Sequence, residues 1–230
     1  MKDIVVITGT SCGIGQATAR RFLAAGYIVH GLDVQPASIE HEMYIHHVVD
    51  ITRTEKLPEI CGVSILINNA GIQTPSLSES FVNTRDIEVN LVALINCTQK
   101  YAIQQPESIQ AVVNLASVSA HNGAEFGEYV ASKGGVLSYT KWTAKQLAPF
   151  GATVNSLSFG GVSTELNHPV MDDPHMWDAI MSQTPMRKWM SPEEAADWIY
   201  FMAATNKSCT GQDVIVDNGE MMNHTFIWSV

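Results

Sequence analysis

Short apolar runs alternate with segments of helical periodicity along the whole chain. Continuous runs rich in β-branched side chains are typical of strands buried on both faces of a parallel sheet. Such runs occupy residues 2–7, 27–32, 44–49, 64–67, 111–115, 153–157 and 213–216. Helical spacing of apolar positions occupies residues 14–25, 84–104 and 129–147. The alternation predicts an α/β fold: a single doubly wound Rossmann domain over residues 1–230, with a central parallel sheet and helices on both faces.

Residues typical of helix ends occur at two places in the chain. Gly26 follows residues 14–25 and predicts that this helix ends there, because glycine adopts the left-handed conformation of a C-cap without strain. Ser191 is followed by Pro192 and, at the third position, by Glu194. That spacing predicts the start of a further helix, with Ser191 as N-cap.

A glycine-rich turn separates the first strand from the first helix. The N-terminus of a helix leaves backbone N–H groups unpaired and can hold a pyrophosphate, and glycine lets the phosphates approach. Asp33 ends the next strand, where a carboxylate can accept hydrogen bonds from the ribose hydroxyls of NAD and repels a 2′-phosphate. A purely structural turn and a methyltransferase with a nucleoside cofactor are the alternatives. The residues of the turn that would hold the cofactor are Gly9, Ser11, Cys12, Gly13, Ile14 and Gly15.

Composition and charge narrow the range of partners. The chain has 13 Lys+Arg and 23 Asp+Glu, a formal net charge of −10, and no basic cluster, which argues against nucleic acid and anionic membranes as partners. We find no signal peptide and no run near the ~20 apolar residues of a membrane span. The four cysteines are scattered and no histidine pair has ligand spacing, so we expect a cytoplasmic protein with reduced thiols and no metal.

Further motifs appear in a fixed order behind the glycine-rich turn. The turn reads TGxxxGxG from Thr8, Asn68-Asn69-Ala70-Gly71 follows the fourth predicted strand, and Tyr129 precedes Lys133 by four residues. In these motifs and their order the chain resembles the short-chain dehydrogenase/reductase family, from Thr8 to Gly219. A methyltransferase would have no reason to carry the later motifs.

The resemblance implies a function and a set of site residues. It implies an NAD(H)-dependent oxidoreductase that interconverts a secondary alcohol and its ketone. The implied catalytic residues are Asn90, Ser117, Tyr129 and Lys133. Beyond the glycine-rich turn and Asp33, the implied cofactor-binding residues are Asp50 and Ile51 beside the adenine, Asn69, Ala70 and Gly71 along the cofactor, Tyr129, Lys133, and Val162 and Thr164 at the carboxamide.

The chemistry of the Tyr129–Lys133 pair also follows from the residues themselves. Side chains four positions apart lie on one face of a helix and can reach a common ligand. A nearby ammonium favours the phenolate, so we expect Lys133 and an oxidised nicotinamide to lower the pKa of Tyr129. Tyr129 would then exchange a proton with the substrate oxygen, and Ser117 would hydrogen-bond that oxygen.

The chain departs from the usual family pattern in three places. Phe159-Gly160 stands where Pro-Gly is usual, the interval from Ser117 to Tyr129 is one residue shorter, and Asp217-Asn218-Gly219 replaces Asp-Gly-Gly. Losing the proline removes a fixed φ near the nicotinamide, so this loop is free to adopt another course.

The substrate prediction rests on one segment and four further residues. Residues 165–190 are rich in Met and Trp and are expected to form a substrate lid, or merely to pack onto the body. Ser117, His121, Tyr129 and Phe159 are the candidate substrate-binding residues. An inactive nucleotide-binding regulator and an epimerase or dehydratase of the same family are the alternative functions. The resemblance further implies a homotetramer, or a dimer, built on the helices at residues 84–104 and 129–147.

Overall fold

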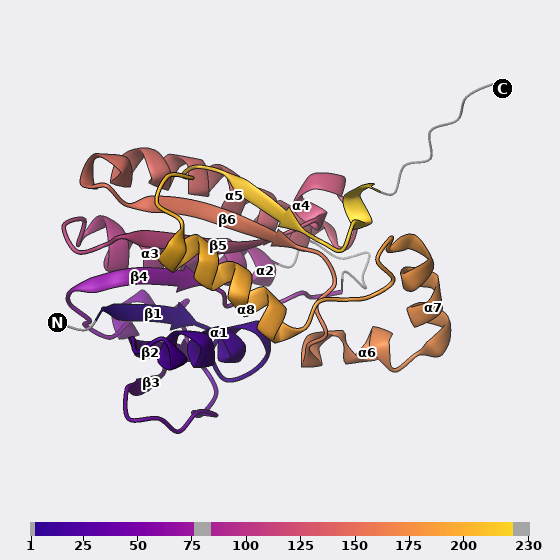
Figure 1. Cartoon of the computed structure of the whole chain (residues 1–230), viewed down its shortest axis with the longest axis horizontal. Coiled ribbons are helices and arrows are strands. Elements are labelled where there is room, and N and C mark those ends of the chain that lie inside the picture. Colours follow the sequence, from indigo (N-terminus) through magenta and orange to yellow (C-terminus); the bar gives the residue numbers. More distant parts are fainter. Residues whose placement is uncertain (1–2, 76–83, 223–230) are drawn as a thin grey trace.

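The strands of the chain form one parallel sheet. The computed structural model describes residues 3–75 and 84–222, and within them seven strands pair in the order β3-β2-β1-β4-β5-β6-β7 (Figure 1). The strands are β1 (Ile4–Thr8), β2 (Ile28–Asp33), β3 (Tyr44–Val48), β4 (Val63–Asn68), β5 (Ala111–Ser117), β6 (Thr153–Phe159) and β7 (Asp213–Val216). From β1 the strands are added towards one edge of the sheet as far as β3, and from β4 they are added towards the other edge. The switch point between β1 and β4 is where ligands bind in sheets of this type. The predicted doubly wound α/β fold is confirmed.

Helices cover both faces of the sheet. One face carries α1 and α8, and the other carries α3 and α5 (Figure 1). The α-helices are α1 (Gly13–Ala24), α2 (Arg85–Ile87), α3 (Ala93–Thr98), α4 (Ser119–Asn122), α5 (Gly127–Leu147), α6 (His168–Met171), α7 (Pro174–Gln183) and α8 (Pro192–Tyr200). Shorter 3-10 and π turns are η1 (Thr54–Lys56), η2 (Glu88–Val92), η3 (Gln99–Ile103), η4 (Ala148–Phe150), η5 (Glu165–Asn167), η6 (Phe201–Thr205) and η7 (Glu220–Met222). None of the helices in the described part is both long and apolar enough to cross a membrane.

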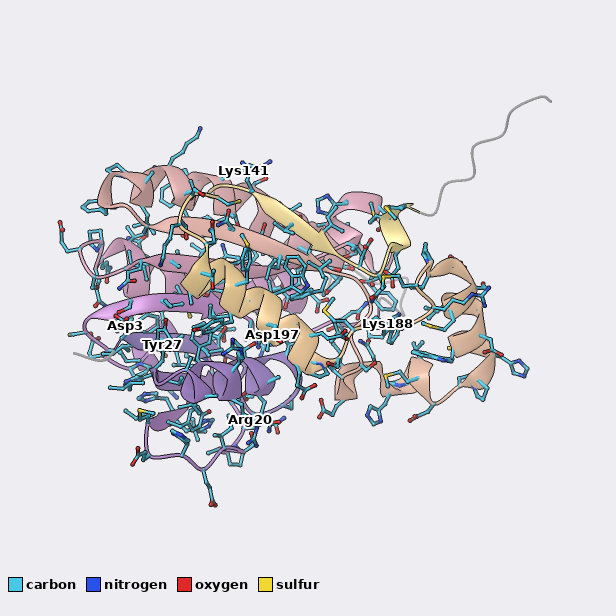
Figure 2. All side chains as sticks on the ribbon, viewed as in Figure 1. Asp3, Arg20, Tyr27, Lys141, Lys188 and Asp197 are labelled. Carbon is cyan, nitrogen blue, oxygen red and sulfur yellow. The ribbon has the colours of Figure 1, made fainter. Side chains whose placement is uncertain are left out.

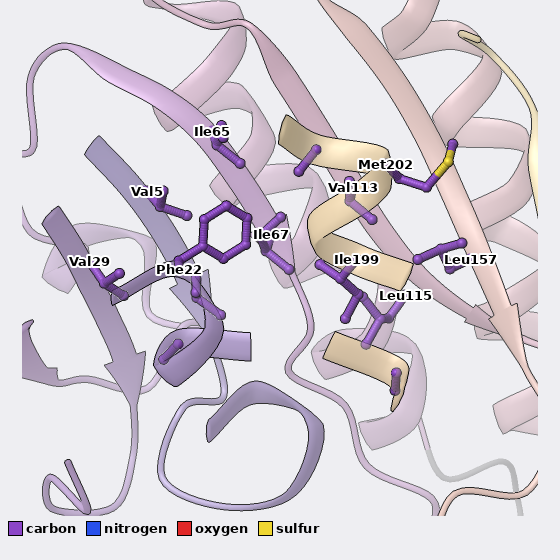
Figure 3. Close-up of a cluster of buried hydrophobic side chains, with 14 of the residues drawn as sticks. Val5, Phe22, Val29, Ile65, Ile67, Val113, Leu115, Leu157, Ile199 and Met202 are labelled. Atoms are coloured by element: carbon purple, nitrogen blue, oxygen red, sulfur yellow. The ribbon is translucent and has the colours of Figure 1, made fainter. Parts of the chain in front are cut away.

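The apolar strand runs are explained by a core on each side of the sheet. Val5 packs into the core beneath α1 and α8, and its neighbour Val6 packs into the core beneath α3 and α5, because successive side chains of a strand point to opposite faces. Figure 3 shows Phe22 of α1 and Ile199 of α8 packed over the strands of the first core. Phe22 is fully buried, which stabilises the fold by roughly 1.5–3 kcal/mol.

The predicted helices form, and one of them departs from regular α-helical geometry. The run predicted at residues 84–104 spans α2 to η3, but it contains two π turns, at Glu88–Val92 and Gln99–Ile103. Ser191 caps α8 in a complete capping box with Glu194, as predicted. Helix α1 ends at Ala24 with Ala25 as its C-cap, one residue before the predicted Gly26, which follows with φ +86°.

An ion pair ties together the two helices of the first face. Arg21 of α1 lies 2.8 Å from the carboxylate of Asp197 on α8 and covers the ring of Tyr200 at 3.8 Å. Figure 2 shows Asp197 beside α1 on the outer surface of this layer. The pair is exposed and therefore adds little stability by itself.

Candidate active site

The carboxyl ends of the central strands open onto a large cavity. Its volume is ≈ 860 Å³, towards the upper end of the range for small-molecule sites. Side chains from β5, β6, α5 and the segment 161–190 face it. The described residues that line it include Ile14, Asn69, Gly71, Ser117, Glu125, Tyr129, Lys133, Phe159, Val162, Thr164, Asn167, Trp189 and Glu220.

The glycine-rich turn is hydrogen-bonded to strand β2 and to the segment that follows β4. The N–H of Gly9 donates to the carbonyl of Leu32 at 2.7 Å, and the Asn69 amide donates to the carbonyls of Thr8 and Gly9 at 2.8 and 2.9 Å. A Cβ on Gly15 would lie 1.8 Å from the Gly9 carbonyl oxygen, so only glycine fits there. Helix α1 begins within the turn, at Gly13, and the side chain of its N-cap, Cys12, makes no capping hydrogen bond. The first N–H groups of α1 therefore have no side-chain cap from Cys12, which suits an anion at this helix end.

Asp33 lies beside the turn, as the predicted ribose site requires. One of its carboxylate oxygens accepts from the Ser11 N–H at 2.9 Å, and the other accepts from the Gln35 N–H at 2.9 Å. These bonds fix the carboxylate and leave lone pairs for further donors.

Asp50 and Ile51 follow β3 and differ in exposure. Asp50 accepts from the hydroxyl and the N–H of Thr52, at 2.7 and 3.0 Å. These bonds, with smaller effects of the Arg85 and Arg53 charges, hold the pKa of the Asp50 carboxyl below its usual value. Ile51 is buried in the core beneath α3 and α5.

Asn90 lies in the π turn Glu88–Val92 and is almost fully buried. Its side-chain amide pairs with the backbone of Ile72 in both directions: Oδ1 accepts from the Ile72 N–H and Nδ2 donates to the Ile72 carbonyl, each at 2.8 Å. The same Nδ2 lies 3.1 Å from Ser132 Oγ on α5. Asn90 therefore fastens the segment after β4 to the helix that carries Tyr129 and Lys133.

Tyr129 and Lys133 stand one turn apart on α5 and both face the cavity. The Lys133 Nζ donates to the Leu115 carbonyl at 2.9 Å and lies 5.7 Å from the centre of the Tyr129 ring. Burial lowers the pKa of Lys133 from 10.5 to about 8, although Glu125 and Asp86 favour its charged form.

The pKa of Tyr129 lies above its usual value. Burial, followed by the charge of Glu125, raises it from 10.0 to about 12, and a hydrogen bond with Ser117 opposes the rise. Removal from water therefore decides the net direction of the shift. The expectation that Lys133 and an oxidised nicotinamide together lower this pKa concerns the loaded enzyme and stays a prediction.

The loop after β6 lies on the cavity wall. Phe159 is buried there, Val162 forms a parallel bridge with Met190, and Thr164 follows as the N-cap of η5. The bridge closes the base of the segment at residues 165–190, whose residues Leu166, Asn167, Val170, Ile180 and Thr184 line the cavity.

His121 lies away from these residues. Its Nε2 is 2.8 Å from a carboxylate oxygen of Asp213 and 3.2 Å from the Ser158 hydroxyl. The Asp213 carboxylate holds the imidazole on the β7 side of β6, and His121 is absent from the described cavity lining. A substrate contact by His121 stays a prediction that this placement does not favour.

Some cavity residues were not found by reading the sequence. Gln183 and Trp189 line the cavity from within the predicted lid at residues 165–190, but Gln73, Glu125 and Glu220 line it as well and were not predicted. They belong to no recognisable motif, and they meet only because the chain returns to this edge after β4, β5, β6 and β7. A further missed feature is the buried chain of amides in which Asn68 Nδ2 donates to Asn114 Oδ1 at 2.8 Å and Asn114 Nδ2 donates to the Thr140 hydroxyl at 2.9 Å.

The parallel sheet, the glycine-rich turn and the Tyr129–Lys133 pair define an oxidoreductase of the short-chain dehydrogenase/reductase class. Residues 9–220 match the family model described as enoyl-(acyl carrier protein) reductase, and the chain belongs to this family.

Named relatives cover nearly the whole chain. The 3-oxoacyl-[acyl-carrier-protein] reductase FabG of Staphylococcus epidermidis is 28% identical over 96% of this chain and 100% of its own length. A solved 4-hydroxyisoleucine dehydrogenase mutant, complexed with NADH and succinate, matches with a TM-score of 0.86 and 29% identity, covering 96% of this chain and 99% of its own. A putative 2-deoxy-d-gluconate 3-dehydrogenase from Agrobacterium tumefaciens, with bound NADP, matches with a TM-score of 0.87 and 26% identity, covering 96% of each.

Proposed function

We propose that the protein interconverts a secondary alcohol and its ketone with NAD(H), and that Tyr129 is the general acid and base. The observation that carries this proposal is the placement of Tyr129, Lys133 and Ser117 on one wall of a cavity that reaches the glycine-rich turn at Ile14. A proton-transfer group, a charged positioning group and an anion-binding helix end are thereby brought to one site.

The residues present fit a dinucleotide. Gly9 and Gly15 are packed too closely for any side chain, and the start of α1 has N–H groups suited to a pyrophosphate. Asp33 and Ser11 would hold the adenosine ribose, and Asn69, Val162 and Thr164 would lie along the nicotinamide half. When bound, the nicotinamide supplies or accepts the hydride.

The protein's own groups would manage the proton. Tyr129 as a phenol can donate its proton to a ketone oxygen as that oxygen gains negative charge. Ser117 would donate a second hydrogen bond to the same oxygen. Lys133 would hold ribose hydroxyls and favour the phenolate that remains, and Asn90 would keep the segment at Ile72 in place beside them.

NAD is proposed over NADP because of Asp33. Its carboxylate is fixed by Ser11 and Gln35 at the position proposed for the adenosine ribose, where a 2′-phosphate would meet a like charge. Relatives are divided on this point: one solved neighbour holds NADH and another holds NADP.

The lid and the assembly belong to the same proposal. Residues 165–190 would close over the substrate, since side chains from this segment already line the cavity.

A homotetramer, or a dimer, would use the helices at residues 84–104 and 129–147, where Val92 and Trp142 are each 46% exposed. The proposed interface would remove both side chains from water, and each apolar group buried in this way favours association.

A screen of alcohols and ketones tests the reaction class. Secondary alcohols are offered with NAD and with NADP, ketones with NADH and with NADPH, and turnover is followed by the absorbance of the reduced nucleotide. We expect turnover of at least one secondary alcohol or ketone. Tight nucleotide binding with no turnover across the panel would favour a regulator over an enzyme.

A further inference from the structure

Two carboxylates from distant parts of the chain face the same cavity as Tyr129. Glu125 lies in the turn between α4 and α5, and Glu220 begins η7 after β7. Glu125 adopts φ +79°, an uncommon conformation for a residue with a side chain. Its carboxylate accepts from the side-chain amide of Gln73 at 3.1 Å, which holds it beside the segment after β4.

Glu220 reaches the cavity through a gap that two glycines provide. Its Oε1 accepts from the Gly161 N–H at 3.3 Å. A Cβ on Gly160 would lie 2.8 Å from Glu220 Oε2, and a Cβ on Gly161 would lie 1.9 Å from Trp189 Nε1. The pair Gly160-Gly161, which follows the unusual Phe159, therefore admits both the carboxylate and the indole to the wall.

The charge of the cavity wall is set by few groups. Among the described lining residues, the charged side chains are Glu125, Glu220 and Lys133. Lys133 is buried and donates to the Leu115 carbonyl, so the more accessible charges are the two carboxylates. Burial raises the pKa of each of them, and the charge of Glu220 raises that of Glu125 further, which opposes ionisation. The hydrogen bonds that each accepts and the Lys133 charge near Glu125 favour the carboxylate form. With two carboxylates and one ammonium, the ionised wall is net negative and rich in hydrogen-bond acceptors.

We propose that Glu125 and Glu220 select an uncharged, hydroxyl-rich substrate, a polyol or the matching ketose, and reject anionic substrates. A carboxylate accepts hydrogen bonds from hydroxyl groups and repels another carboxylate or a phosphate. Neutral side chains of Gln73, Asn122 and Gln183 on the same wall can complete the hydrogen bonds of further hydroxyls. The inference rests on the proposed function, because it assigns a substrate class to that same site.

Matched pairs of ligands isolate the charge. Sorbitol and gluconate share one carbon skeleton and differ at a terminal CH₂OH or carboxylate, and ribitol and ribonate form a second pair. Dissociation constants are measured by calorimetry on the full chain loaded with nucleotide. We expect each polyol to bind about tenfold or more tighter than its aldonate.

The variants Glu125→Gln and Glu220→Gln, alone and together, keep the size of the side chain and remove the charge. The double variant should lose most of the discrimination, because the aldonates bind tighter. Asp172→Asn is the control: it removes the charge of an equally negative, exposed side chain that is not part of the described cavity lining. Its discrimination should equal that of the unchanged protein. An unchanged nucleotide affinity shows that each variant is folded.

Three outcomes would overturn the inference. The aldonates could bind as tightly as the polyols, or the double variant could leave the ratio of aldonate to polyol dissociation constants unchanged. The third is that the nucleotide-loaded protein binds neither member of either pair. Because the readout is binding, it is separate from the proposed reaction. A protein that discriminates and turns nothing over would refute the proposed function alone, and an active enzyme that does not discriminate would refute the substrate class alone.

Discussion

Replacing Lys133 by Met should stabilise the protein near neutral pH. Burial lowers the pKa of Lys133 from 10.5 to about 8, so holding its charge in the folded state costs about 3 kcal/mol. Methionine is of similar length and has no charge to desolvate. The substitution also removes the hydrogen bond to the Leu115 carbonyl, worth about 1 kcal/mol. We therefore expect a net gain of about 2 kcal/mol in the free energy of unfolding.

The gain should depend on pH in a defined direction. Between pH 8 and 10.5 the unfolded chain keeps the Lys133 proton that the folded chain has released, so the stability of the unchanged protein rises with pH. Above this window only the lost hydrogen bond remains, and the variant should be less stable by about 1 kcal/mol. The advantage of Lys133→Met is thus full below pH 8 and reverses at high pH.

Urea unfolding at several pH values measures this difference. Lys141→Met is the control, because Lys141 lies on the outer surface of the same helix, α5 (Figure 2). It should change stability little and show no such dependence on pH. A Lys133→Met protein that is less stable near neutral pH, or whose stability difference is the same at all pH values, would refute the reasoning.

Two further predictions concern the cofactor and the assembly. Asp33→Ala should lower the ratio of NAD to NADP activity by about tenfold or more, because the like charge at the ribose is removed; an unchanged ratio of kcat/KM would show that discrimination lies elsewhere. Sedimentation at micromolar concentration should give a tetramer or a dimer, since Val92 and Trp142 expose apolar area on the helices proposed for the interface. A monomer would reject that interface.

The sheet was predictable because its signal is local. Val5 and Val6 face opposite cores, so an uninterrupted apolar run is what a central parallel strand requires. The π turns within residues 85–103 were not predictable, because apolar spacing indicates a helix without showing where an extra residue widens it. Asn90 lies in one of these turns, so its hydrogen bonds to Ile72 also depend on geometry that spacing does not reveal.

The pKa shifts in the site were harder to predict from the sequence than the identity of the site residues. The motif identifies Tyr129 and Lys133, but the rise in the Tyr129 pKa comes from burial and from Glu125, and neither is visible in a spacing of four residues. Glu220 approaches the cavity only because Gly160 leaves room for its carboxylate. Such groups come together through the crossovers of the sheet, which a linear motif does not describe.

The proposed reaction is tested most directly by one comparison of turnover. The unchanged protein and Tyr129→Phe are given the best substrate of the screen, and reduced nucleotide is followed while nucleotide affinity is measured separately. We expect kcat to fall by about 10³-fold while the nucleotide still binds, because the proton donor is removed. A Tyr129→Phe protein that retains its turnover would contradict the assignment of Tyr129 as general acid and base.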